Sequence, residues 1–62
     1  LRRFREVLDE FGERERLLLR ARFEGTESFE SLARKLGYSS QFAARRAFFA
    51  AQGRLLTRLR AR

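Results

Sequence analysis

The sequence contains no cysteine, no histidine and no proline, and only four of its 62 residues are glycine. Without cysteine and histidine, the chain has no disulfide, neither the thiolate nor the imidazole ligands typical of zinc sites, and no imidazole for catalysis. Without proline, little interrupts a helix. No apolar run approaches the roughly 18 residues that a transmembrane helix needs. These absences argue against an enzyme, and we expect no cofactor, no metal ion and no membrane partner.

Acidic residues are missing from the second half of the chain. The formal net charge is +7, with 15 basic residues, 14 of them arginine, against 8 acidic ones. All eight acids lie in residues 1–30 beside seven arginines, whereas residues 31–62 contain eight basic residues and no acid. A solvated helical surface normally mixes both signs, because opposite charges four residues apart stabilise a helix. The charge therefore predicts an anionic partner for the second half.

Apolar residues recur at intervals of three and four, and no segment alternates as a strand would. We therefore predict an all-α fold, a small four-helix domain with a C-terminal helix-turn-helix, over residues 1–62. The expected helices span residues 1–11, 13–24, 28–36 and 40–59. Because the chain begins with Leu1 and contains no methionine, we also expect it to be a fragment of a longer protein.

Two of these helices are expected to supply most of the core. The second has apolar residues on two nearly opposite sides, which is typical of a helix that lies between others. Those residues are Leu17, Leu18 and Ala21 on one side, and Leu19 and Phe23 on the other. The fourth carries an inward stripe of Ala44, Ala47, Phe48, Ala51, Leu55 and Leu59. We predict that the second helix is the central element and that the fourth packs across the third.

The last two helices have the pattern of a helix-turn-helix. That motif needs a short first helix, a small residue where the helices cross, and a tight turn through glycine. Ser28 is the expected N-cap, Ala33 leaves room for the crossing, and Gly37 can adopt the positive φ of the turn. Tyr38 is expected to plug that turn. Short helix pairs with a glycine turn also occur in structural bundles, but the acid-free second half favours DNA binding.

Several segments of the chain, in this order and spacing, resemble a known family. The resemblance is carried by ERERLLLR (13–20), FEG (23–25), SFE (28–30), LA (32–33), LGYSS (36–40) and AARRAF (43–48). Together they resemble the promoter-recognition domain, region four, of bacterial sigma factors, especially of the extracytoplasmic-function group. The sequence departs from that pattern at three places. Two residues, Thr26 and Glu27, separate Gly25 from Ser28, where one is usual. Ser31 stands where an acidic residue is frequent, and Gly53 lies within the last helix, where helix-forming residues are usual.

The resemblance implies that the fourth helix binds a promoter −35-type element in the major groove of double-stranded DNA. It also implies RNA polymerase core as a partner, an anti-sigma factor in some members, and a place in the bacterial cytoplasm. The residues expected to contact base edges are Ser40, Gln41, Phe42, Arg45 and Arg46. Those expected to contact phosphates are Arg34, Lys35 and Ser39.

Two other functions stay open on the sequence alone. The fold and charge would also suit a response-regulator output domain, which usually dimerises on paired half-sites. A protein-interaction module, binding RNA polymerase or an anti-sigma factor, would instead use apolar surfaces. Its candidate residues are Phe4, Leu8, Phe11, Leu17, Leu19 and Phe23, although a core position is equally natural for most of them. Phe42 and Phe49 project away from the inward stripe, and for Phe49 we favour packing or a protein contact over DNA.

Overall fold

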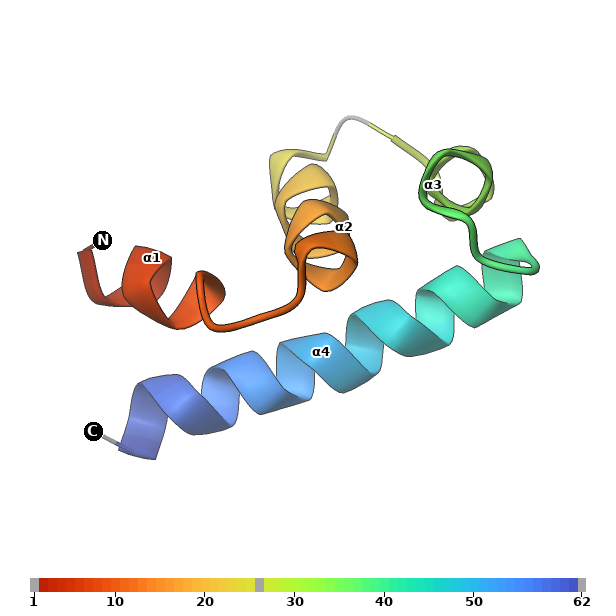
Figure 1. Ribbon diagram of the computed structural model, residues 1–62. Helices are drawn as coiled ribbons and strands as arrows, with labels where there is room; N and C mark the ends of the chain where they lie inside the picture. The colour runs from red at the N-terminus through yellow and green to blue at the C-terminus, as the bar shows by residue number, and fades with distance from the viewer. Residues whose placement is uncertain (1, 26, 62) are drawn as a thin grey trace.

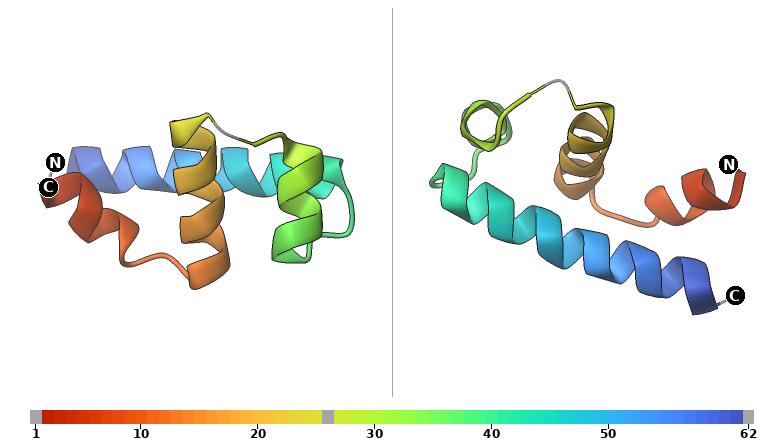
Figure 2. Two further views of the ribbon diagram at one scale, coloured as in Figure 1. Left: turned by 90° about the horizontal axis from the view of Figure 1, so that it is seen from above. Right: turned by 180° about the vertical axis from the view of Figure 1, so that it is seen from behind.

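The computed structural model describes residues 2–25 and 27–61, and this part of the chain contains four helices and no strand. The helices are α1 (Arg2–Leu8), α2 (Glu13–Glu24), α3 (Phe29–Leu36) and α4 (Gln41–Ala61). The predicted all-α fold of four helices is confirmed. Helices α1, α2 and α3 form one layer on one side of the long α4, with α3 over its N-terminal end and α1 beside its C-terminal half (Figures 1 and 2).

Helix α4, rather than α2, is the central element. It packs against each of the other three helices, whereas α2 packs against α3 and α4. The prediction that α2 is the central element, covered on both of its apolar sides, is therefore wrong: Leu18 and Leu19 are buried, but Leu17 and Phe23 are exposed. The three other helices form a single layer on α4, so no second layer covers α2 (Figure 1). Phe23 still contacts Phe4 of α1 and Phe48 of α4, with ring centroids 5.8 and 6.1 Å apart, but its ring is only partly covered.

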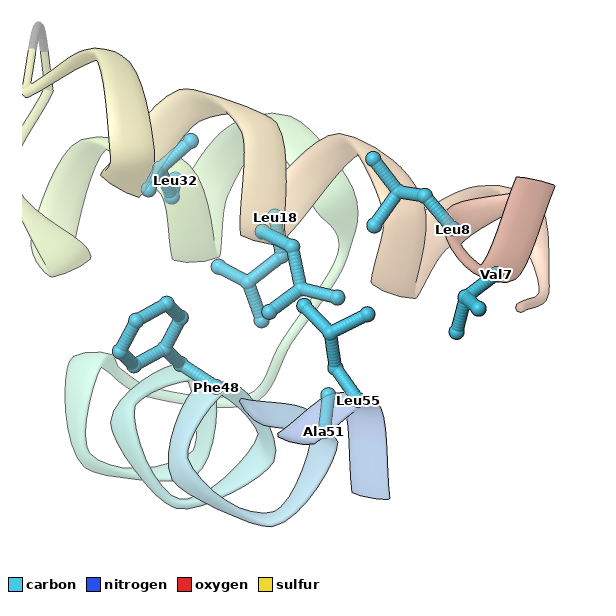
Figure 3. Packing of buried hydrophobic residues seen from close by; sticks show 8 residues of the cluster. Val7, Leu8, Leu18, Leu32, Phe48, Ala51 and Leu55 are labelled. Atoms are coloured by element: carbon cyan, nitrogen blue, oxygen red, sulfur yellow. The ribbon is translucent and has the colours of Figure 1, made fainter. Parts of the chain in front are cut away.

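The core lies between α4 and this layer. Phe48, Ala51 and Leu55 project from α4 toward Leu18 and Leu32 (Figure 3). The buried hydrophobic residues are Val7, Leu8, Leu18, Leu19, Leu32, Ala33, Ala44, Phe48, Ala51 and Leu55. The inward stripe predicted for α4 is therefore confirmed, with Ala47 and Leu59 partly buried at its margins.

Local capping explains most helix ends. Gly25 and Gly37 end α2 and α3 with left-handed φ values of 71° and 82°, and the value at Gly37 confirms the predicted positive φ of the turn. The Ser28 hydroxyl accepts the N–H of Ser31 at 3.1 Å and so caps α3 at its N-terminus. Gly53 does not interrupt α4, which continues through it to Ala61.

Helix α1 is shorter than predicted, and α4 is longer. After Leu8, the N–H groups of Glu10 and Phe11 donate to carbonyl groups three residues back, at 3.0 and 3.1 Å. Such bonds tighten the last turn and end the α-helix before residue 11, while Phe11 packs against the core. Leu1, where the first helix was predicted to start, lies outside the described residues. So does Thr26, one of the two residues between Gly25 and Ser28.

Candidate nucleic-acid interface

The first two turns of α4 present a row of exposed side chains. Gln41, Phe42, Arg45 and Arg46 are all exposed, as the sequence predicted. The helix begins here because the Ser40 hydroxyl oxygen accepts the N–H of Ala43 at 3.1 Å. While it accepts this bond, the Ser40 hydroxyl can still donate its own proton to a base edge, because a hydroxyl is both a donor and an acceptor. All five predicted base-contacting residues therefore stand at the N-terminal end of one helix.

Most cationic side chains of the second half form an ion pair, but Arg45 and Arg46 do not, within the part of the chain that the structure describes. Within residues 2–25 and 27–61, neither forms a salt bridge, whereas four of the others do. The pairs are Arg34–Glu30 at 3.6 Å, Lys35–Glu27, Arg54–Glu15 at 2.6 Å, and Arg58–Glu10. The acids of the first half thus offset charge on α3 and on the C-terminal half of α4. Uncompensated charge is left at the N-terminal half of α4.

Aromatic rings lie beside these two arginines. Phe42 and Phe49 are 63% and 52% exposed. The guanidinium carbon of Arg45 lies 5.7 Å from the centroid of the Phe49 ring, within the range of a cation–π contact. Phe49 also packs edge-on against Phe48, with ring centroids 5.2 Å apart. Phe42, Arg45, Arg46 and Phe49 line one hollow on the outer face of α4.

The residues predicted to contact phosphates flank this row. Arg34 and Lys35 lie in the last turn of α3, Ser39 lies in the connection to α4, and all three are exposed. Because α3 sits over the N-terminal end of α4, the predicted phosphate and base contacts gather at one end of the molecule (Figure 1). The sequence did not predict that Arg34 and Lys35 would each already face a carboxylate.

Of these two pairs, Lys35–Glu27 is the more embedded. Both partners of Arg34–Glu30 are mostly exposed, and such pairs contribute little to stability. Glu27 is partly buried and also accepts the hydroxyl of Ser31 at 3.0 Å. The Lys35 ammonium, and then the Ser31 hydroxyl, hold the pKa of Glu27 below its ordinary value of 4.5.

This lowered pKa predicts a pH dependence of stability. A carboxylate with a lowered pKa in the folded state stabilises the fold fully above its ordinary pKa, and that contribution disappears as the pH falls through the lower, folded value. We therefore expect the melting temperature of the wild-type chain to fall below about pH 4.5, as followed by circular dichroism.

Substitution of Glu27 should remove the part of the fall in melting temperature that is due to protonation of its carboxylate. The Glu27→Gln variant should lose less stability on acidification than the wild type. Glu24→Gln removes an exposed carboxylate with no ion pair in the described ranges. Because this variant keeps Glu27, its melting temperature should still show the fall that protonation of Glu27 causes. Equal losses in the wild type and in Glu27→Gln would contradict the assigned cause.

A contact from α2 to the turn before α4 was also not predicted. The guanidinium carbon of Arg14 lies 4.1 Å from the centroid of the Tyr38 ring. Its Nη1 donates to the carbonyl oxygens of Leu36 and Gly37, at 3.5 and 3.4 Å. More than 20 residues separate Arg14 from these partners, so no local pattern in the sequence indicates the contact.

The apolar residues considered as protein contacts separate into two groups. Leu8 and Leu19 are buried, and Phe4 and Phe11 pack against the core. The large apolar residues that stay exposed are Leu17, Phe23, Phe42, Phe49 and Leu56. Three of these five lie on α4, which makes its outer face the larger candidate surface for a partner.

Residues 2–25 and 27–61 contain no group of three acidic side chains that could hold a metal ion. In the same part of the chain, no helix combines the length and apolarity needed to cross a membrane. The chain matches no family model, no curated protein and no solved structure.

Proposed function

We propose that the chain is a non-catalytic, sequence-specific DNA-binding module. Helices α3 and α4 would act as a helix-turn-helix, with the N-terminal half of α4 in the major groove. The observation that carries this proposal is the pair Arg45 and Arg46, exposed and without a salt bridge in the described residues. They stand on the same helix face as Phe42, at the end of the molecule where α3 meets α4.

The residue types on this face match the chemistry of base edges. Arginine can donate two hydrogen bonds to the O6 and N7 atoms of guanine, and glutamine can bind the N6 and N7 atoms of adenine. An aromatic ring such as that of Phe42 can contact the methyl group of thymine. Gln41, Phe42, Arg45 and Arg46 together thus have the means to distinguish bases.

Phosphate contacts would set the position of α4 in the groove. Such contacts fix orientation without reading sequence. Arg34, Lys35 and Ser39 flank α4 on the side from which the chain enters it, and the N-terminus of a helix itself favours an anion. The resemblance to sigma-factor region four supports a promoter −35-type element as the target. It also supports RNA polymerase core as a partner, an anti-sigma factor as in some members, and the bacterial cytoplasm as the place of action.

A protein-interaction module is the second candidate, because Phe49 and Leu56 stay exposed on α4 beyond the predicted base contacts. The salt dependence of duplex binding separates the two. If about five phosphates are neutralised, the logarithm of the association constant should fall against the logarithm of salt concentration with a slope of about −4 to −5. Absent binding, or binding that does not respond to salt, would contradict DNA recognition.

The Glu27–Lys35 pair predicts a substitution that tightens DNA binding. A phosphate must compete with the Glu27 carboxylate for Lys35, whose side chain is mostly exposed. We expect Glu27→Gln to strengthen binding to all duplexes by up to about fivefold, as measured by fluorescence anisotropy.

Two controls distinguish this effect from a general loss of negative charge. Glu24→Gln removes the same charge from an exposed site, and it should strengthen binding less. In a Lys35→Ala background, the effect of Glu27→Gln should shrink to that of Glu24→Gln. Equal effects of the two single variants would show that Glu27 does not restrain Lys35.

A further inference from the structure

The turn that leads into α4 is held from α2 by one side chain. Arg14 stacks on the ring of Tyr38 and donates to the carbonyl groups of Leu36 and Gly37. Carbonyl groups at the end of a helix have no intrahelical donor, and a cation is favourable there because it faces the negative end of the helix dipole. The guanidinium of Arg14 thus satisfies both requirements at the C-terminus of α3.

The same turn is also fixed from within. Gly37 has a φ of 82°, and the N–H groups of Gly37 and Tyr38 both donate to the carbonyl oxygen of Ala33 at 3.0 Å. The side chain of Tyr38 packs against the core. Tyr38 is therefore the point at which the core, the end of α3 and Arg14 meet, three residues before α4 begins at Gln41.

We propose that Arg14 is a positioning residue for DNA recognition. By holding Tyr38 and the last carbonyl groups of α3, it fixes the direction in which α4 starts, and hence the placement of Gln41 and Phe42. This inference rests on the proposed DNA-binding function. Base recognition depends on side chains held within about 0.5 Å by their supporting contacts, so a looser turn should cost selectivity before it costs the fold.

The test compares Arg14→Gln with Arg20→Gln. Arg20 is an exposed arginine of the same helix, with no ion pair in the described stretches, so the two variants lose the same charge. Dissociation constants are measured for a duplex selected by the wild type and for a scrambled duplex, over a series of salt concentrations. Circular dichroism checks that each variant is folded.

We expect Arg14→Gln to lower the preference for the selected duplex by about fivefold, from loss of a cation–π contact and two charged hydrogen bonds. Its salt slope should equal that of Arg20→Gln. Arg14→Lys keeps the charge and donors but lacks the planar group that stacks, so it should restore part of the preference. It also serves as the test if Arg14→Gln does not fold.

Other outcomes overturn the assignment. If Arg14→Gln weakens both duplexes alike and flattens the salt slope by about one more unit than Arg20→Gln does, Arg14 contacts phosphate directly. If the wild type is selective and Arg14→Gln is equally selective, only the positioning role fails. If the wild type binds no duplex selectively, the proposed function fails and this role with it.

A readout without DNA tests the geometry separately. Amide hydrogen exchange of Gly37 and Tyr38 should be faster in Arg14→Gln than in the wild type, by about fivefold. The buried Leu18 and Leu19 of α2 should exchange at unchanged rates. Unchanged exchange at Gly37 and Tyr38 would overturn the idea that Arg14 holds the turn.

Discussion

Leu55→Ala should lower the free energy of unfolding by about 2–5 kcal/mol. Leu55 is 1% exposed and projects from α4 into the centre of the core (Figure 3). Truncation to alanine loses the transfer free energy of the buried methyl groups and leaves a cavity in the side of α4 against which the other helices pack. Because small domains have a total stability of about 5 kcal/mol or somewhat more, a loss at the upper end of this range would leave part of the variant unfolded at room temperature.

The next residue provides a matched control. Leu56 has the same side chain on the same helix but is 49% exposed. Leu56→Ala should change the free energy of unfolding by no more than about 0.5 kcal/mol. Urea unfolding followed by circular dichroism measures both variants. Equal losses for Leu55→Ala and Leu56→Ala would contradict the assigned orientation of α4.

Arg45→Ala and Arg46→Ala should have the largest effects on DNA binding. An arginine that contacts a guanine edge is worth about 1–3 kcal/mol, and its loss relaxes the preference at one base pair. Both side chains are exposed, so the fold should tolerate either change. Competition with duplexes substituted at single positions measures the loss for each base pair. We expect at least one of the two variants to lose discrimination at one position.

Two control variants show whether the effects of Arg45→Ala and Arg46→Ala come from base contacts. Arg60→Ala removes an exposed arginine near the other end of α4 and should leave the base preference unchanged. Lys35→Ala should weaken binding to all sequences alike, because a phosphate contact carries no base information. An equal loss for every duplex in both Arg45→Ala and Arg46→Ala would mean that neither arginine reads a base.

Features set by neighbouring residues could be predicted from the sequence. Gly25 and Gly37 end their helices because a left-handed residue is needed there, and Ser28 caps α3 through the N–H three residues on. The inward stripe of α4 follows from helical periodicity and places Phe48 and Leu55 in the core. The capping signals are local, so they hold whatever the arrangement of the helices.

Features that depend on distant segments could not be predicted. Which face of α2 is covered depends on where α1 and α3 pack, so its periodicity alone led to the wrong central element. The pair Arg54–Glu15 joins residues 39 apart in the sequence. Because this pair and Arg58–Glu10 offset two of the arginines of α4, the sequence count of eight unopposed basic residues in the second half overstates the free charge at the C-terminal half of this helix. The contact of Arg14 with Tyr38 was missed for the same reason.

Selection from a library of random duplexes tests the central claim most directly. The wild-type chain is incubated with the library, bound duplexes are recovered and amplified over several rounds, and the final pool is sequenced. We expect enrichment of one short asymmetric element, with the preference at one position lost in Arg45→Ala or Arg46→Ala. A pseudo-palindromic element would favour the response-regulator type of output domain. A final pool indistinguishable from the starting library would contradict sequence-specific DNA binding.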